Sequence, residues 1–251
     1  MNKPTLLIIA STVFFCISPV SAKHGKHQCV KQQDFPVITN YKADPLLAPF
    51  CKIIPGDYAN GIADTMIYLK NRDLNYYLDF AAKNDNNTIN AAIEIPAGTN
   101  AKFETSIETG RMFWELKKGV PRLVKFLGYP GNYGMVPQTL SGDGDPLDVV
   151  VIGGNLLRGS VAQVKVIGVF KLIDGGDNDE KLIAVIPDSP LGELNTIEEL
   201  NTQYPGVTEI LKSWLTNYKG PDGELQSNGF GDVEEANSIL DAAIGLFEAN
   251  N

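Results

Sequence analysis

The sequence predicts an α+β domain, a small β-barrel flanked by helices, that follows an N-terminal export signal. Short segments rich in Val and Ile and bounded by Gly, Pro or Asp occur from residue 91 onward, and these are typical of strands. Apolar residues then recur at helical spacing near the end of the chain. A chain of 251 residues with 43% hydrophobic residues can bury one sizeable core, and its composition excludes disordered and fibrous proteins.

The first 22 residues have the pattern of a secretory signal peptide. Lys3 precedes an apolar run at 6–15, and small residues at 20–22 provide a cleavage point. A buried strand or a single membrane anchor is the alternative, but the run is short for a span and Pro19 follows it. We therefore expect an exported protein, periplasmic or secreted, with no membrane contact after signal cleavage.

Two cysteines remain after this cleavage, Cys29 and Cys51. An even pair in an oxidising compartment can form a disulfide, which we predict here; two free thiols are the alternative. The sequence has no CxxC motif, which excludes zinc-ribbon and thioredoxin-like sites.

The chain is acidic, with a formal net charge of −9 that becomes −10 when Lys3, one positive charge, leaves with the signal. Such a surface repels nucleic acid and anionic membranes, so we expect neither as a partner. An anionic substrate stays compatible with this charge if metal ions mediate the contact.

The mature chain divides into an N-terminal extension at 23–85 and a domain at 86–251. The extension contains scattered prolines and ends in a polar, turn-like stretch. In the domain we predict strands at 91–95, 147–152, 161–170 and 182–186, and helices near 207–218 and 233–247. Asp232 with Glu235, and Thr196 with Glu199, are typical of helix starts.

The strongest chemical signal is the hexapeptide at 143–148, in which Asp143, Asp145 and Asp148 precede a Val-rich strand. Three carboxylates this close repel one another unless water or cations surround them. Oxygen ligands of this kind suit Mg²⁺, Mn²⁺ or Ca²⁺, although a solvated acidic turn is the alternative. The positions of Leu147 and Asp148 do not fit an EF-hand loop.

Two further groups of charged residues are weak signals when taken alone. Asp174 and Asp179 lie with Lys181 between two predicted strands, as in an ordinary hairpin turn. Lys102 and Glu104 point to the same face of a strand, as in a surface ion pair.

Together, seven separated blocks resemble the family I soluble inorganic pyrophosphatases. The blocks are IEIP at 93–96, NAKFE at 100–104, KGVPR at 118–122, YPGNYG at 129–134, DGDPLDV at 143–149, the group Asp174, Asp179 and Lys181, and the pair Tyr218 and Lys219. The resemblance implies a five-stranded OB-like β-barrel with the site at its mouth. It also implies Mg²⁺-dependent hydrolysis of inorganic pyrophosphate, and a homo-oligomer.

The resemblance further implies a role for each residue. A water that bridges two Mg²⁺ ions would attack phosphorus, and Asp145 would be the catalytic base. Glu104 would have a supporting role, without binding the metal or the substrate itself. The metal ligands would be Glu94, Asp143, Asp148, Asp174 and Asp179, and the substrate-binding residues would be Lys102, Arg122, Tyr133, Lys181, Tyr218 and Lys219.

Two other functions stay open from the sequence. One is a broader metal-dependent phosphohydrolase that acts on nucleotides or polyphosphate. The other is an exported metal-binding or sugar-binding barrel without catalysis. The second has no use for the cationic residues, which argues against it.

Overall fold

The computed structural model describes residues 51–54, 66–69 and 74–251, the first two ranges as backbone alone. The predicted signal peptide at 1–22, most of the predicted extension and Cys29 lie outside the described residues. Export and the Cys29–Cys51 disulfide therefore stay predictions. Along the helices that the structure describes, none is long and apolar enough to span a membrane.

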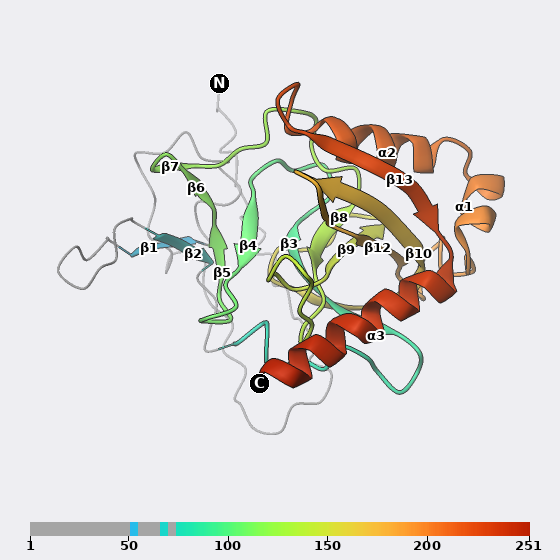
Figure 1. Cartoon of the computed structure of the whole chain (residues 1–251), viewed down its shortest axis with the longest axis horizontal. Helices are drawn as coiled ribbons and strands as arrows, with labels where there is room; N and C mark the ends of the chain where they lie inside the picture. Colours follow the sequence, from blue (N-terminus) through green and yellow to red (C-terminus); the bar gives the residue numbers. More distant parts are fainter. Residues whose placement is uncertain (1–50, 55–65, 70–73) are drawn as a thin grey trace, which may run out of the picture. The chain divides into compact units, whose positions relative to one another are not determined.

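Five strands close into a barrel through a ring of backbone pairings (Figure 1). They are β3 (Ile89–Ile95), β8 (Asn132–Met135), β9 (Asp148–Ile152), β10 (Val161–Asp174) and β12 (Lys181–Val185). β3 pairs with β8, β8 with β9, β9 with β12 and β12 with β10, and the start of β10 returns to β3. The ring confirms the predicted barrel, and closure leaves these strands without exposed edges.

The long strand β10 takes part in both the barrel and an outer layer. Its register against β12 shifts between Val166 and Gly168, and the φ of Gly168 is 158°. A Cβ at Gly168 would lie 2.7 Å from the carbonyl oxygen of Gly231, so the approach of the next strand requires glycine there. The second half of β10 pairs with β11 (Asp177–Asn178) and β13 (Leu225–Gly231).

The barrel strands are buried on both faces, which explains their unbroken Val and Ile runs. Along β9, Val149 and Val151 pack in one cluster, and Val150 and Ile152 pack in another. The first cluster includes residues of α3 (Val233–Asn250), and the second includes residues of α1 (Ile197–Gln203) and α2 (Val207–Asn217). Figure 1 shows α3 crossing the sheet apart from α1 and α2.

The predicted helices are confirmed, with their caps. Asp232 accepts a hydrogen bond from the backbone N–H of Glu235, and Thr196 accepts one from Glu199. Each cap satisfies a backbone donor that the helix itself leaves unpaired. On α2, Leu211, Trp214 and Leu215 are buried, whereas Ile210, which continues the same apolar run, is 60% exposed.

A second sheet escaped the sequence analysis. It contains, in spatial order, β1 (Cys51–Ile54), β2 (Met66–Leu69), β5 (Met112–Trp114) and β4 (Phe103–Thr105), with a nearby ribbon of β6 (Leu116–Lys117) and β7 (Val120–Pro121). The rings of Phe103 and Trp114 stack 5.2 Å apart in its core. Tyr76 and Tyr77, from the predicted extension, are buried in the same cluster, so residues just before 86 belong to this core.

Candidate active site

The acidic hexapeptide forms a tight turn that leads directly into β9. The N–H of Asp145 donates to Asp143 Oδ1 at 3.0 Å, and Gly144 has a φ of 92°. Buried Thr139 anchors the turn from below, because its hydroxyl accepts from the N–H of Leu147 at 2.9 Å. The turn therefore holds Asp143 and Asp145 at the surface while Asp148 begins the strand.

Lys181 joins Asp148 and Asp179 into one cluster. β9 and β12 run parallel with Lys181 beside Asp148, so the barrel itself sets this contact. The ammonium group of Lys181 binds the carboxylates of both Asp148 and Asp179, and its side chain is only 4% exposed. Tyr133 on β8 donates its hydroxyl to the same Asp148 oxygen at 2.6 Å.

Asp174 and Lys219 extend this acidic group outward. Asp174 ends β10, and Lys219 follows α2 by two residues. Their charged groups form an ion pair. A cavity of about 530 Å³ lies beyond them, lined by Gly175, Thr216 and Gln226 among others, and none of the predicted site residues lines it.

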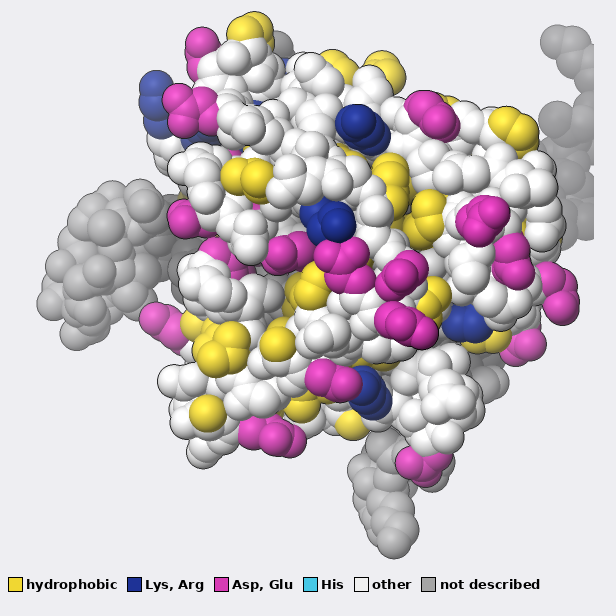
Figure 2. All heavy atoms as spheres, turned by 45° about the vertical axis from the view of Figure 1, so that its right-hand side comes forward, with side chains coloured by type: hydrophobic (Ala, Val, Ile, Leu, Met, Phe, Trp, Pro, Cys, Tyr) yellow, Lys and Arg dark blue, Asp and Glu magenta, His cyan; other side chains and the backbone are white. Residues whose placement is uncertain are grey.

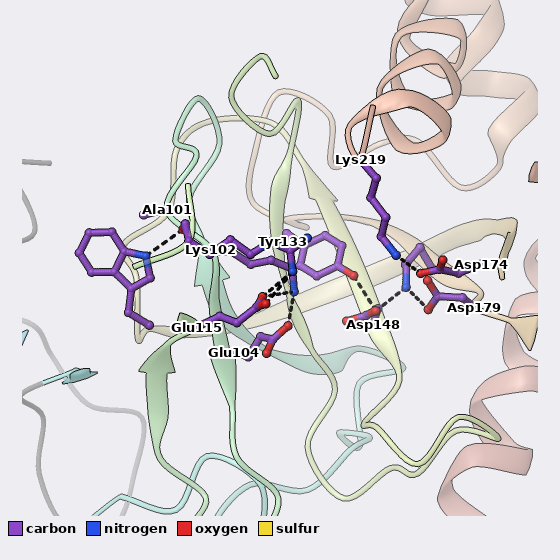
Figure 3. Close-up of polar contacts among 12 residues, drawn as sticks. Ala101, Lys102, Glu104, Glu115, Tyr133, Asp148, Asp174, Asp179 and Lys219 are labelled. Atoms are coloured by element: carbon purple, nitrogen blue, oxygen red, sulfur yellow. Dashed lines mark hydrogen bonds and ion pairs between the residues drawn. The ribbon is translucent and has the colours of Figure 1, made fainter. Parts of the chain in front are cut away.

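A second group of charges comes from the second sheet and its ribbon. Lys102 forms an ion pair with Glu104 and lies 3.6 Å from Glu115. Arg122 donates to both oxygens of Glu115, at 2.8 and 2.6 Å. Figure 3 shows Lys102, Glu104 and Glu115 on one side of Tyr133, and Asp148, Asp179, Asp174 and Lys219 on the other.

Aromatic side chains form the wall behind these charges. Tyr218 stacks on Trp214 with ring centres 4.8 Å apart, and Tyr129 lies 4.2 Å from Trp214 and 5.3 Å from Tyr133. The indole N–H of Trp214 donates to the carbonyl of Leu127 at 2.9 Å. The wall fixes the places of the Tyr133 and Tyr218 hydroxyls.

The pKa values show how closely the charges crowd. Burial, and then the charge of Asp148, raises the pKa of Glu94 to about 8. Partial burial together with Asp143 and Asp148 raises the pKa of Asp145. Burial opposes the charge of Lys181, but Asp148 and Asp179 still raise its pKa, so it stays cationic.

The oxygen-rich donor set fits Mg²⁺, because a hard cation offsets the mutual repulsion of crowded carboxylates. Within the described part of the chain, no three acidic or His/Cys side chains already stand as a ready-made metal cage. Lys181 and Lys219 hold the carboxylates of Asp148, Asp179 and Asp174 instead. These lysines would have to give way for the carboxylates to bind a metal.

All of the predicted site residues lie in this one cluster. Asp145 lies close enough to Asp143, Asp148 and Glu104 for their charges to influence its pKa. Tyr218 lies close enough to Lys102, Lys219 and Lys181 for the same effect. On the face drawn in Figure 2, several acidic side chains near the centre lie beside a Lys or Arg side chain.

Residues 91–248 match the sequence model of the family described as inorganic pyrophosphatase. The chain belongs to the inorganic pyrophosphatase family. Inorganic pyrophosphatase 1 of Caenorhabditis elegans is 37% identical over an alignment of 185 positions that covers 64% of this chain and 43% of that protein. The inorganic pyrophosphatase of Debaryomyces hansenii is 38% identical over an alignment of 166 positions that covers 58% of each chain. The chain thus spans about half the length of these sequence relatives.

Solved structures of pyrophosphatases have the same fold. The enzyme from Schistosoma japonicum gives a TM-score of 0.66 at 30% identity, covering 74% of this chain and 76% of that one. The enzyme from Toxoplasma gondii gives a TM-score of 0.68 at 26% identity, covering 80% and 99%. These matches, together with the closed ring of strands, confirm the predicted fold class.

Sequence reasoning missed Glu115, Tyr129 and Trp214. Glu115 stands in the run ELKKG, which has the composition of an ordinary surface turn. Only the antiparallel pairing of β4 and β5 brings it to Lys102. Tyr129 was noted within the YPGNYG block, but no role was assigned to it; it is close enough to Lys102 to influence the pKa of that lysine.

Proposed function

We propose that this protein hydrolyses inorganic pyrophosphate to two phosphates with Mg²⁺ as cofactor. The observation that carries the proposal is the meeting of two groups in one site. Asp148, Asp174 and Asp179 supply metal ligands, and Lys102 and Arg122 supply phosphate donors. Membership of the pyrophosphatase family supports the reaction type.

The charge of the site makes metal ions necessary for binding as well as for chemistry. If all were ionised, eight carboxylates and four cationic side chains would leave the site with a net negative charge, which repels pyrophosphate. They are Glu94, Glu104, Glu115, Asp143, Asp145, Asp148, Asp174, Asp179, Lys102, Arg122, Lys181 and Lys219. When bound, Mg²⁺ would offset this charge and lower the pKa of a coordinated water.

The metal ligands we propose are Asp143, Asp148, Asp174, Asp179 and Glu94. They come from the hexapeptide turn and the start of β9, from β3, from the end of β10 and from the segment between β11 and β12. Glu104 keeps the ammonium of Lys102 in place by their ion pair.

Asp145 is the base that accepts the proton of the attacking water in this proposal. It is exposed and stands on a tight turn, and partial burial together with the charges of Asp143 and Asp148 raises its pKa, which makes it a better proton acceptor. Arg122, Lys102 and the hydroxyls of Tyr133 and Tyr218 hold the phosphate oxygens from the opposite side. Lys181 and Lys219 exchange their carboxylate partners for phosphate when the metals bind.

Phosphate release from pyrophosphate by the purified chain, with Mg²⁺ or with a chelator, tests this proposal. We expect release that requires Mg²⁺, and much slower release from ATP and tripolyphosphate. Equal rates on all three substrates would favour the broader phosphohydrolase, and no release with Mg²⁺ would favour a binding barrel without catalysis.

We further propose that the protein is exported and acts as a homo-oligomer. The signal-like pattern at 1–22 motivates the first statement, and the family resemblance motivates the second. N-terminal sequencing of the mature protein and its sedimentation behaviour test the two separately. An N-terminus at Met1 or Asn2 would contradict export by this signal.

A further inference from the structure

Glu94 occupies a β-bulge in strand β3. Ile93 pairs with Gly134 on β8 and Ile95 pairs with Tyr133, so a two-residue step along β3 matches a one-residue step along β8. Without a bulge, Ile93 and Ile95 would share one face of the strand. Instead they pack into different clusters. The bulge therefore turns the strand at the point where Glu94 enters the site.

On its other edge, the backbone pairing of β3 with the segment that leads into β10 ends immediately before this bulge. The N–H of Ile93 donates to the carbonyl of Ser160 at 2.9 Å, and the N–H of Gly159 donates to the carbonyl of Ile93 at 2.7 Å. The next carbonyl along β3, that of Glu94, accepts from the guanidinium of Arg158 instead. The side chain of Arg158 thus continues the pairing where the backbone of its own segment can no longer do so.

The same guanidinium nitrogen reaches a second part of the site. Arg158 Nη1 lies 3.4 Å from the carbonyl oxygen of Ala101, the residue before Lys102. Glu94 and Lys102 are eight positions apart in the sequence; Glu94 lies on β3, and Lys102 directly precedes β4 of the second sheet. Arg158 is therefore a direct link between the backbones that carry them.

Arg158 is itself held in a fixed place. Its guanidinium carbon lies 3.9 Å from the ring centre of Phe103, which is fully buried. The next residue, Gly159, accepts a hydrogen bond from the hydroxyl of Tyr76 at 2.9 Å. A side chain locked in this way can transmit a defined geometry to the two strands that it touches.

We propose that Arg158 is a positioning residue of the active site, which sets the placement of Glu94 and Lys102 through their backbones. This inference rests on the proposed function. Arg158 touches carbonyl groups and not the reacting atoms, so it acts through the two residues that it places. The planar guanidinium donates to two carbonyls at once. The ammonium group of lysine keeps the charge but not this geometry, so we expect lysine to replace Arg158 only in part.

A double-mutant cycle tests the proposal. Arg158→Met, Arg158→Lys and Glu94→Gln are made singly, and each Arg158 variant is also combined with Glu94→Gln. Lys165→Met is the matched control, because Lys165 also donates to a backbone carbonyl, that of Gly192, away from the site. Three quantities are measured: kcat/KM for pyrophosphate with Mg²⁺, the affinity for methylenediphosphonate with Mg²⁺ by calorimetry, and the melting temperature.

We expect Arg158→Met to lower kcat/KM by about 10- to 100-fold, as a small misplacement of binding groups does, and Arg158→Lys to lower it less. In the Glu94→Gln background the same changes should have clearly smaller effects, because the residue through which Arg158 acts is already impaired. Lys165→Met should alter the melting temperature at most. If Arg158→Met does not fold, Arg158→Lys carries the cycle.

Equal losses in both backgrounds would show that Arg158 does not act through Glu94, and a lower melting temperature with unchanged kcat/KM would show a purely structural role. Either result would overturn the proposal. If the wild-type protein binds methylenediphosphonate but does not hydrolyse pyrophosphate, the proposed function fails and the cycle of affinities still decides the role of Arg158. If it does not bind methylenediphosphonate, both proposals fall.

Discussion

The two halves of the active site are built on different kinds of scaffold. The acidic half stands on the barrel, where the parallel register of β9 and β12 places Lys181 beside Asp148. The cationic half, with Lys102 and Arg122, stands on β4, on β5 and on the two-stranded ribbon of β6 and β7. The ribbon turns through Lys118 and Gly119, both with positive φ. Long buried strands hold the positions of their side chains mainly through packing, whereas short strands depend more on local polar contacts.

Those contacts form a closed set around Lys102, Glu115 and Arg122. The N–H of Glu115 donates to the carbonyl of Lys102 at 3.0 Å, that of Lys102 to Arg122 at 3.0 Å, and that of Arg122 to Glu115 at 2.8 Å. The side chains of Lys102 and Arg122 are also linked, because both contact the carboxylate of Glu115. Thus the barrel half depends on burial, and the other half depends on a local polar network.

The largest effect is expected at Asp145, where the two halves meet. Asp145→Asn keeps the shape of the side chain but cannot accept a proton, so turnover should fall by about 10²–10⁴-fold. Affinities for Mg²⁺ and pyrophosphate should change little. Asp188→Asn, in an exposed turn, is the matched control, measured by steady-state phosphate release. A loss below about threefold, far under the usual range, would place the base elsewhere.

A smaller effect is expected at Glu115, which sharpens the contrast between the halves. Glu115→Gln removes the charge that holds Arg122, so KM for pyrophosphate should rise roughly tenfold, as loss of a charge-assisted hydrogen bond does. The Mg²⁺ dependence should not change. Glu108→Gln, exposed in the turn between β4 and β5, is the control. An unchanged KM, or an altered Mg²⁺ dependence, would refute the separation of the two halves.

The smallest effect concerns stability without metal. The folded pKa of Glu94, about 8, lies above the ordinary value of 4.5 for glutamate, so the folded state binds a proton more tightly than the unfolded one. Stability should therefore fall as pH rises from about 4.5 to 8. Asp148 and Glu104 strengthen this dependence, and Lys102 opposes it.

Glu94→Gln should abolish that dependence and stabilise the metal-free protein at pH 8 by at most roughly 4 kcal/mol. Chemical denaturation at pH 5 and pH 8 in a chelating buffer measures it. Equal stability of the wild type at both pH values would show that burial does not raise the pKa of Glu94 as predicted.

The contrast between the halves also explains what the sequence could predict. Four of the barrel strands and α3 have apolar patterns that predicted their positions, although β10 continues to Asp174 and not to 170. The fifth barrel strand, β8, was not predicted, because its sequence NYGM has no apolar run. β4, β5, β6 and β7 have two or three residues each, too few for a periodic signal. β13 escaped because its sequence LQSNGFG contains glycine and polar residues that resemble a loop.

The residues of the candidate site were predicted by resemblance and not by pattern. The hexapeptide at 143–148 gave a metal signal of its own, but Arg122, Tyr218 and Lys219 had no meaning outside the family blocks. Arg158 contacts the carbonyl of Glu94, 64 positions away in the sequence, and Glu115 meets Arg122, 7 positions away, only because the ribbon folds back. A sequence without its fold reveals neither contact.

The most direct test of the two-half account is a crossed titration of Asp148→Asn and Arg122→Gln. Phosphate release is measured over a grid of Mg²⁺ and pyrophosphate concentrations for both variants and the wild type. Excess Mg²⁺ should partly restore turnover of Asp148→Asn, because a metal ligand is lost, and excess magnesium pyrophosphate should restore that of Arg122→Gln. Rescue of both variants by the same component, or rescue of Arg122→Gln by Mg²⁺ alone, would contradict the account.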